Sequence, residues 1–460
     1  MAERLSTLDA SYVYLEEAGA PLHVAGVLVL EPVEGGLDAL AELVEARLPL
    51  VPRYRQRVVP VPGHLANPVW VDDPDFDVAY HVRRSAVPRP GTQAQLLDLV
   101  SRVTSRPLDR ARPLWEVYLV EGLAEGRVAV VTKTHPALVD GLGAVDIAQV
   151  LLDTTPDAPL PAVDDWVPAR VPGPVELVRD ALAEYVERPT AVLEHAWAAA
   201  GDLRATAARV RSAAGGLVRA AGSAAVPPPQ GPLSRTVGSQ RRVAVARADL
   251  DDLRAIRKAH GGTVNDVLLT VLTGALRDWL LSRGEPVLGS TVVRALVPVS
   301  LQGEEPGAAG GGVSAHLVDL PVGEPNPWVR LARLGYAMRS VTDSGRSVRA
   351  SSLVALTGFA PPTLHALGAR AARGLSRRLF SLVVTNVPGP QVPLYAAGSR
   401  MLEVFPVVPL LSGQALSVGM TSYDGRVHVG LNADLDGVGD VEVLADLLEQ
   451  EVAALTESVR

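Results

Sequence analysis

Hydrophobic and polar positions follow two kinds of pattern in the first part of the chain. Short Val-rich runs at 23–32 and 127–135 are typical of buried strands. Between these runs, residues 92–103 carry apolar side chains at helical spacing, namely Leu96, Leu97, Val100 and Val103. The combination predicts an α/β region that extends to about residue 155.

The C-terminal part repeats this combination. A strand is expected over 241–250, followed by a helix that ends at Gly261–Gly262, and a longer helix is expected over 263–284. Asp424–Gly425 predicts the turn of a β-hairpin. Five further strands are expected at 290–300, 314–322, 381–389, 414–425 and 426–434.

The segment between these parts has a different composition. Proline-rich stretches at 153–174 and 227–232 interrupt regular structure, and residues 174–222 between them are rich in Ala and Arg. The pattern favours surface helices that connect two domains, and an amphipathic segment that contacts lipid is the alternative. The predicted division is 1–155, 156–240 and 241–460.

Composition excludes several classes of function. The 460 residues are 48% hydrophobic, with a mean hydropathy of +0.19, so the chain can bury large cores and is not disordered. A net charge of −8 argues against a nucleic-acid-binding protein. The absence of cysteine excludes disulfides, thiolate metal sites and cysteine nucleophiles. No metal-ligand spacing or dinucleotide fingerprint appears in the sequence, so we expect neither a metal nor a cofactor.

The beginning of the chain does not resemble a signal peptide. Glu3, Arg4 and Asp9 place charges where such a peptide needs an apolar stretch. No run of 18 uncharged apolar residues occurs, so no transmembrane helix is expected. We therefore expect a cytoplasmic protein whose contact with a membrane is peripheral.

The segment KTHPALVDGLGAVD, at 133–146, holds the most suggestive group of polar residues. It places His135, Asp140 and glycines directly after a predicted strand. An aspartate five residues after a histidine can hold a loop or orient an imidazole, and glycine lets a ligand approach the backbone. A lone histidine at a strand end is more often structural, so these residues alone leave both interpretations open.

HPALVDG (135–141) resembles the HHxxxDG motif of the wax ester synthase/diacylglycerol acyltransferase family, within the superfamily of chloramphenicol acetyltransferases and condensation domains. Other motifs of the family recur in the same order. They are LSTLDASYVYLE (5–16), PLHVAG (21–26), DFDVAYHVR (75–83), RPLDRARPLWEVYLVEGL (106–123), GTVNDVLL (262–269), VPVSL (297–301), TNVPGP (385–390) and PLYAAG (393–398).

The resemblance implies two chloramphenicol-acetyltransferase-like halves, each a mixed β-sheet flanked by helices, joined by a helical linker. It implies transfer of a fatty acyl group from acyl-CoA, as a substrate, to diacylglycerol or a long-chain alcohol. The product would be triacylglycerol or a wax ester. It also implies that the second histidine of the motif takes the proton from the acceptor hydroxyl, which attacks the thioester directly. A peripheral position on the inner membrane face or on lipid droplets would suit such substrates.

The chain departs from the family at the position of that base. When the motif is aligned on Asp140–Gly141, the first histidine is His135, and Pro136 occupies the second position. Proline has no ionisable group and cannot act as a base. Neighbouring side chains on an extended segment point to opposite faces, so His135 would need a local twist to replace it. The alternatives are catalysis by His135, with Asp140 orienting the loop, or a non-catalytic relative that binds acyl lipids.

The resemblance also suggests substrate-binding residues, namely Gly141, Trp115, Asn265, Asp266 and Asn386. Four of these residues have a structural alternative. Asn265 and Asp266 could cap a helix, Trp115 could be a packing anchor, and Asn386 could satisfy a turn.

Further alternatives concern the base and the reaction class. His23 and His81 are candidate substitute bases if the fold brings either of them near Asp140. Gly311 stands where the family often has asparagine, which would loosen that loop or tune acceptor binding. A peptide-forming condensation domain shares the HHxxxDG signature but is disfavoured, because the PLW motif at 113–115 and NVPGP at 386–390 match the lipid enzymes.

Overall fold

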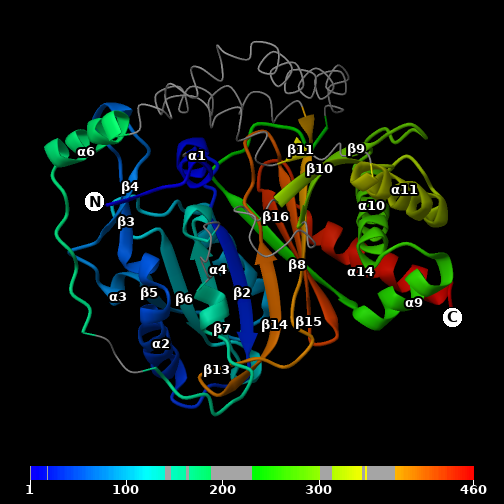
Figure 1. Cartoon of the computed structure of the whole chain (residues 1–460). Helices are drawn as coiled ribbons and strands as arrows, with labels where there is room; N and C mark the ends of the chain where they lie inside the picture. The colour runs from blue at the N-terminus through cyan, green and yellow to red at the C-terminus, as the bar shows by residue number, and fades with distance from the viewer. Residues whose placement is uncertain are drawn as a thin grey trace, which may run out of the picture.

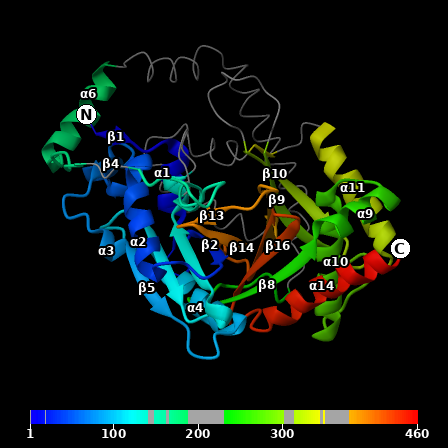
Figure 2. The same ribbon diagram turned by 90° about the horizontal axis from the view of Figure 1, so that it is seen from below.

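The structure is a computed structural model of the chain. It describes residues 2–17, 19–139, 147–161, 165–187, 231–300, 313–343, 348–349 and 379–460. The predicted site residues Asp140 and Gly141, the loop position Gly311 and most of the predicted helical linker lie outside these ranges. Figures 1 and 2 show an N-terminal α/β half in blue and cyan beside a C-terminal half in green to red.

A six-stranded sheet forms the N-terminal half. Its order is β13 (Tyr395–Ala396), β14 (Ser399–Val407), β2 (Val24–Leu30), β7 (Val128–Thr134), β6 (Trp115–Glu121) and β5 (Val82–Ala86). All neighbours are antiparallel except β5 and β6. The strands predicted at 23–32 and 127–135 are therefore confirmed as β2 and β7.

Helices cover both faces of this sheet. One face contacts α2 (Gly36–Arg47), and the other packs against α4 (Gln93–Ser105) and against β8 (Arg241–Asp249) of the C-terminal half. The side chain of Thr92 and that of Gln95 form a reciprocal capping box that begins α4. The apolar face predicted for this helix is buried at Leu96, Leu97, Val100 and Val103.

A small outer sheet lies at the side of the N-terminal half. It contains β1 (Glu3–Arg4), β4 (Val69–Asp72) and β3 (Gln56–Val59). Helix α6 (Pro174–Glu187), the described part of the predicted linker helices, buries Leu177 and Ala181 against it. Nearby lie α1 (Thr7–Leu15) and α3 (Val78–His81) (Figure 1).

The C-terminal half is built on a seven-stranded sheet. Its order is β11 (Val348–Arg349), β10 (Val313–Leu320), β9 (Val293–Ser300), β12 (Leu382–Pro388), β15 (Leu416–Tyr423), β16 (Arg426–Asp434) and β8 (Arg241–Asp249). Strand β12 is parallel to both of its neighbours, and the other pairs are antiparallel. The predicted hairpin is confirmed, because Asp424 and Gly425 both have positive φ and join β15 to β16.

Helices α9 (Leu250–His260), α10 (Val264–Ser282), α11 (Pro327–Asp343) and α14 (Val441–Glu457) pack with one face of this sheet in the largest core cluster. Gly261 ends α9 at positive φ, as predicted. The predicted apolar face of α10 is buried at Leu268, Leu272, Ala275, Leu276 and Trp279. No helix within the described ranges has the length and apolar character needed to cross a membrane.

Strand β14 ties the two halves together. It belongs to the C-terminal part of the sequence but pairs with β2 in the N-terminal sheet (Figure 1). It also passes directly over β15 and β16, where a Cβ atom on Gly430 would lie 1.8 Å from the carbonyl oxygen of Pro406. Glycine is therefore required at this crossing. The hydrophobic pattern alone does not predict that a strand from the C-terminal part joins the N-terminal sheet.

Candidate functional site

The motif turn begins where β7 ends. His135 keeps an extended backbone, and its N–H donates to the carbonyl of Leu114 at 3.0 Å, which continues the ladder between β7 and β6. A short 3₁₀ turn, η5 (Pro136–Leu138), follows. Proline suits the first position of such a turn, because its φ is already set and it has no N–H to leave unpaired.

His135 caps this turn with its side chain. Its Nδ1 accepts the backbone N–H of Ala137 at 3.1 Å, and the residue is 1% exposed. An amide can only donate, so Nδ1 carries no proton and the neutral ring carries its proton on Nε2. Nε2 is buried and has no hydrogen-bond partner within the described part of the chain.

The surroundings of His135 keep the ring neutral. Burial lowers the pKa of His135 to about 4; the carboxylate of Glu16 acts in the opposite sense, and Arg110 lowers the pKa further. For His135 to act as a base, either Nδ1 would have to take the proton or the ring would have to change tautomer and free Nε2, and both changes give up the cap on Ala137. The geometry therefore gives His135 a structural task, and its predicted catalytic role remains a prediction.

A second histidine, His23, directly precedes the first residue of β2. His23 is buried, and its Nε2 lies 3.1 Å from the carbonyl oxygen of Thr104, near the end of α4. A carbonyl can only accept, so Nε2 carries the proton, and Nδ1 has a lone pair with no partner among the described residues. Burial and then the nearby ammonium of Lys133 lower the pKa of His23 well below its usual value.

Lys133 belongs to a buried ionic cluster next to the motif. It is fully buried and pairs with Glu116, directly opposite on β6, with an Nζ–Oε2 distance of 3.2 Å. Glu116 also pairs with Arg83 at 3.1 Å and accepts the hydroxyl of Tyr118 at 2.9 Å. This cluster was not predicted from the sequence, although Lys133 is one of two lysines among 43 basic residues.

His81 and Trp115 lie on the other face of the N-terminal sheet. The two rings stack with centroids 4.5 Å apart, and Nδ1 of His81 lies 2.8 Å from the backbone carbonyl of Trp115. The indole N–H of Trp115 donates to the carbonyl of Tyr54 at 2.7 Å, and the side chain is completely buried. These contacts make Trp115 a packing anchor, so its predicted contact with substrate rests on the resemblance alone.

The structure brings two of the predicted substrate-binding residues into contact. Nδ2 of Asn386, on β12, donates to Oδ1 of Asn265, at the start of α10, at 3.0 Å. Asp266 instead caps the helix: its carboxylate accepts the N–H of Thr263 at 2.8 Å, and the Thr263 hydroxyl accepts the N–H of Asp266 at 3.1 Å. The capping interpretation therefore holds for Asp266, while Asn265 and Asn386 form an amide pair.

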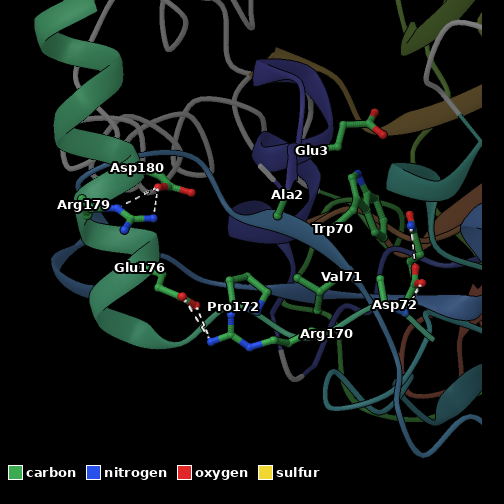
Figure 3. A pocket seen from close by; sticks show the side chains of 12 residues that line it. Ala2, Glu3, Trp70, Val71, Asp72, Arg170, Pro172, Glu176, Arg179 and Asp180 are labelled. Carbon is green, nitrogen blue, oxygen red and sulfur yellow. Dashed lines mark hydrogen bonds and ion pairs between the residues drawn. The ribbon is translucent and has the colours of Figure 1, made fainter.

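A cavity of about 500 Å³ lies elsewhere, between the small outer sheet and α6 (Figure 3). Its charged side chains are paired locally, as in Arg170 with Glu176 at 3.1 Å and Arg179 with Asp180 at 3.2 Å. None of the described residues predicted for the site lines it. This cavity therefore does not mark the place of the proposed chemistry.

The described residues contain no cluster of three or more His, Asp or Glu side chains that could hold a metal ion. The polar groups near the motif turn include imidazoles, an ammonium–carboxylate pair and backbone carbonyls. Such a set suits hydrogen bonding and proton transfer. The expected absence of a metal and of a cofactor stays a prediction.

Models of two domains match the chain. One, described as the wax ester synthase/diacylglycerol acyltransferase catalytic domain, matches residues 5–268. The other, described as the WS/DGAT C-terminal domain, matches residues 309–456. Together they span both halves.

Two relatives in Mycobacterium tuberculosis strain H37Rv have similar sequences. The chain is 46% identical over 269 residues to a probable diacylglycerol O-acyltransferase, tgs3. This alignment covers 56% of this chain and 97% of that relative. It is 32% identical over 455 residues to a second one, tgs1, with 98% of this chain and 95% of the relative covered.

Solved structures of similar fold include a wax ester synthase/diacylglycerol acyltransferase from Marinobacter aquaeolei VT8. It has a TM-score of 0.70 and 27% identity and covers 99% of each chain. The first condensation domain of the calcium-dependent antibiotic synthetase has a TM-score of 0.56 and 16% identity, with 100% of this chain and 96% of that chain covered. At this identity the likeness concerns the fold alone, and the fold predicted from the sequence is confirmed.

Proposed function

The chain belongs to the wax ester synthase/diacylglycerol acyltransferase family, and we propose that it transfers a long acyl chain from acyl-CoA to diacylglycerol. A long-chain alcohol is the second acceptor in this proposal, and the products are triacylglycerol and a wax ester. The observation that carries the proposal is the match to both family models over nearly the whole chain. Each of the two relatives described above is named as a "probable" diacylglycerol O-acyltransferase.

The motif turn supports an active protein despite Pro136. The ladder reaches His135, the cap holds η5 in place, and the rings of His135 and His23 are both buried and neutral. A neutral imidazole is the form that can accept a proton from a hydroxyl. The turn is thus ordered without a histidine at 136.

The site residues inferred from the resemblance have the following proposed roles. As the resemblance implies, Asp140 would orient the motif loop and Gly141 would leave room for the substrate. Asn265 and Asn386 line the acceptor path as an amide pair, and Asp266 and Trp115 support that path through capping and packing. His135 contributes the N–H at Nε2, because its other nitrogen is engaged in the cap.

We further propose that the protein works at a lipid surface, such as the inner membrane face or a lipid droplet, because the acceptor and product are water-insoluble. Helix α6 has an outer face with Val175 82% and Leu182 51% exposed, and Arg179 lies between them. Exposed aliphatic side chains on one face of a helix favour contact with the headgroup region of a lipid layer.

Acyl transfer from radiolabelled palmitoyl-CoA to diolein and to hexadecanol tests the proposed reaction. Labelled triacylglycerol from the parent protein is the expected result, and labelled wax ester is expected as a second product. Tight binding of palmitoyl-CoA without either ester, in the parent and in Pro136→His alike, would contradict acyl transfer. Ester formed only by Pro136→His would identify a lipid-binding relative that lost its base.

A further inference from the structure

Two buried ring nitrogens next to the motif turn have no hydrogen-bond partner among the described residues, Nδ1 of His23 and Nε2 of His135. The terminal pair of the β2–β7 ladder is Val24 opposite Thr134, so one more step of this antiparallel register places His23 opposite His135. Residues paired across strands lie about 4.5–5.5 Å apart at Cα.

The two rings also lie on the same face of the sheet. Side chains alternate along a strand, so His23 shares a face with Ala25, and His135 shares one with Val131. Ala25 and Val131 belong to one buried cluster that faces α4 and β8. The charge of a protonated His135 would lower the pKa of His23, which agrees with the proximity of the two rings.

The unpaired atoms are complementary. The hydrogen bond to Thr104 fixes the proton of His23 on Nε2 and leaves Nδ1 as an acceptor. The cap on Ala137 fixes the proton of His135 on Nε2, so that atom is a donor. Buried polar atoms are nearly always satisfied, yet no direct hydrogen bond joins these two.

We propose that the two imidazoles together bind one hydroxyl group, that of the acceptor alcohol, and that His23 takes its proton. The hydroxyl oxygen accepts the Nε2–H of His135 and donates its hydrogen to Nδ1 of His23, which satisfies both atoms. His23 then supplies, from the neighbouring strand, the base that Pro136 cannot supply. This assignment rests on the acyl transfer proposed above.

The step balances without another reactant. The hydroxyl oxygen forms a bond to the carbonyl carbon of the thioester while its proton moves to Nδ1 of His23. The carbon–sulfur bond breaks, and the departing thiolate of CoA takes the proton back from the imidazolium. The ester and CoA leave, and His23 is neutral again.

The charged groups around His23 suit a base that holds a proton only briefly. Lys133 from β7 and Arg241 from β8 face it as cations, and the Thr104 carbonyl of α4 accepts its N–H. Glu116 partly compensates the charge of Lys133. The cations oppose a lasting imidazolium, so the ring is neutral before the reaction and returns its proton to the thiolate readily.

Histidine ¹⁵N NMR of the parent protein tests the hydroxyl site without turnover, with His23→Gln and His135→Asn used to assign the two rings. Both rings are expected as the Nε2–H tautomer. Addition of 1-octanol is expected to shift Nδ1 of His23 and Nε2 of His135, and octane is expected to shift neither. If octanol shifts neither ring, the two nitrogens bind only water, and the proposal is overturned. Equal shifts with octane and with octanol would also overturn it.

Kinetics of matched variants test the proton transfer. His23→Gln retains an N–H for Thr104 but has no basic nitrogen, so kcat with diolein should fall about 10²–10⁴-fold, with KM for palmitoyl-CoA unchanged. His135→Asn retains a capping oxygen but loses the ring N–H, so kcat should fall about tenfold. His260→Gln, on the exposed end of α9, should match the parent. An unchanged kcat in His23→Gln would overturn the assignment.

The two experiments separate this inference from the proposed function. If the parent forms no ester but octanol shifts both rings, the hydroxyl site stands and the acyl transfer falls. If the parent forms ester but octanol shifts neither ring, the acyl transfer stands and the paired-histidine site falls.

Discussion

The imidazole of His135 accepts the backbone N–H of Ala137 at 3.1 Å and so caps the turn that Pro136 begins. This contact uses the only lone pair of the neutral ring. The first histidine of the motif therefore holds the turn in shape, and a base for the acceptor hydroxyl must come from another residue.

Replacement of Pro136 by histidine tests whether the parent lacks a base. Because we assign proton transfer to His23, we expect Pro136→His to raise kcat for diolein by less than about tenfold. Pro136→Ala is the matched control, since it removes proline without adding an imidazole. A rise of about 10²-fold or more in Pro136→His alone would mean that the parent has no working base.

Substitution of His135 tests its structural role. His135→Ala removes the cap and leaves a cavity, so the free energy of unfolding should fall by about 2–4 kcal/mol. His135→Asn keeps an oxygen that can accept the N–H of Ala137, so its free energy of unfolding should fall by less. Urea denaturation at pH 7 measures both values. Equal losses in the two variants would show that the cap contributes little.

The buried pair Lys133–Glu116 predicts an asymmetry between its partners. Glu116→Gln leaves a fully buried ammonium without a carboxylate and should destabilise the fold by about 3–5 kcal/mol. Lys133→Met should lower the free energy of unfolding by less, because Glu116 still pairs with Arg83. Denaturant unfolding of both variants at pH 7 measures the two losses. A larger loss for Lys133→Met would contradict this account of the cluster.

His428 predicts a dependence of stability on pH. It is fully buried on β16, its two ring nitrogens have no partner among the described residues, and burial lowers its pKa from 6.5 to about 4. The unfolded chain therefore binds a proton between about pH 6.5 and pH 4 that the folded chain does not, so stability falls as the pH decreases through this range.

Replacement of His428 by leucine should remove this contribution. Between pH 7 and pH 5, His428→Leu should lose about 2 kcal/mol less stability than the parent. Parallel curves for the parent and His428→Leu would refute the assignment.

The outer face of α6 predicts lipid contact. Val175→Asp combined with Leu182→Asp should abolish flotation with phospholipid liposomes, because two charges replace exposed aliphatic side chains. Val443→Asp, a 43% exposed position on α14, is the matched control and should float like the parent. Unchanged flotation of the α6 variant would rule out this helix as the contact.

Several elements were predictable because their signals are local. The Val-rich runs became β2 and β7, the helical spacing at 92–103 became α4, and Asp424–Gly425 formed the hairpin turn. Each depends on side-chain periodicity or on the backbone preference of one or two residues. The family motifs could likewise be recognised because each consists of residues that are close together in the sequence.

Other features arise from contacts between residues far apart in sequence. The pairing of β14 with β2 joins residues near 404 to residues near 28, and Gly430 permits the close crossing. No local pattern encodes such a pairing, because strand partners depend on which edges meet in the folded chain. The pairing of Lys133 with Glu116 could not be predicted from the sequence for the same reason.

The sequence by itself determined the α/β class, the order of most strands, the family and the loss of a histidine at position 136. These follow from periodicity, from composition and from residue identity. Only the tertiary structure decided which nitrogen of His135 is engaged and which lone pair of His23 is unused. A hydrogen bond fixes a tautomer only when donor and acceptor are held in place, and here the packing of β2, β7 and α4 holds them.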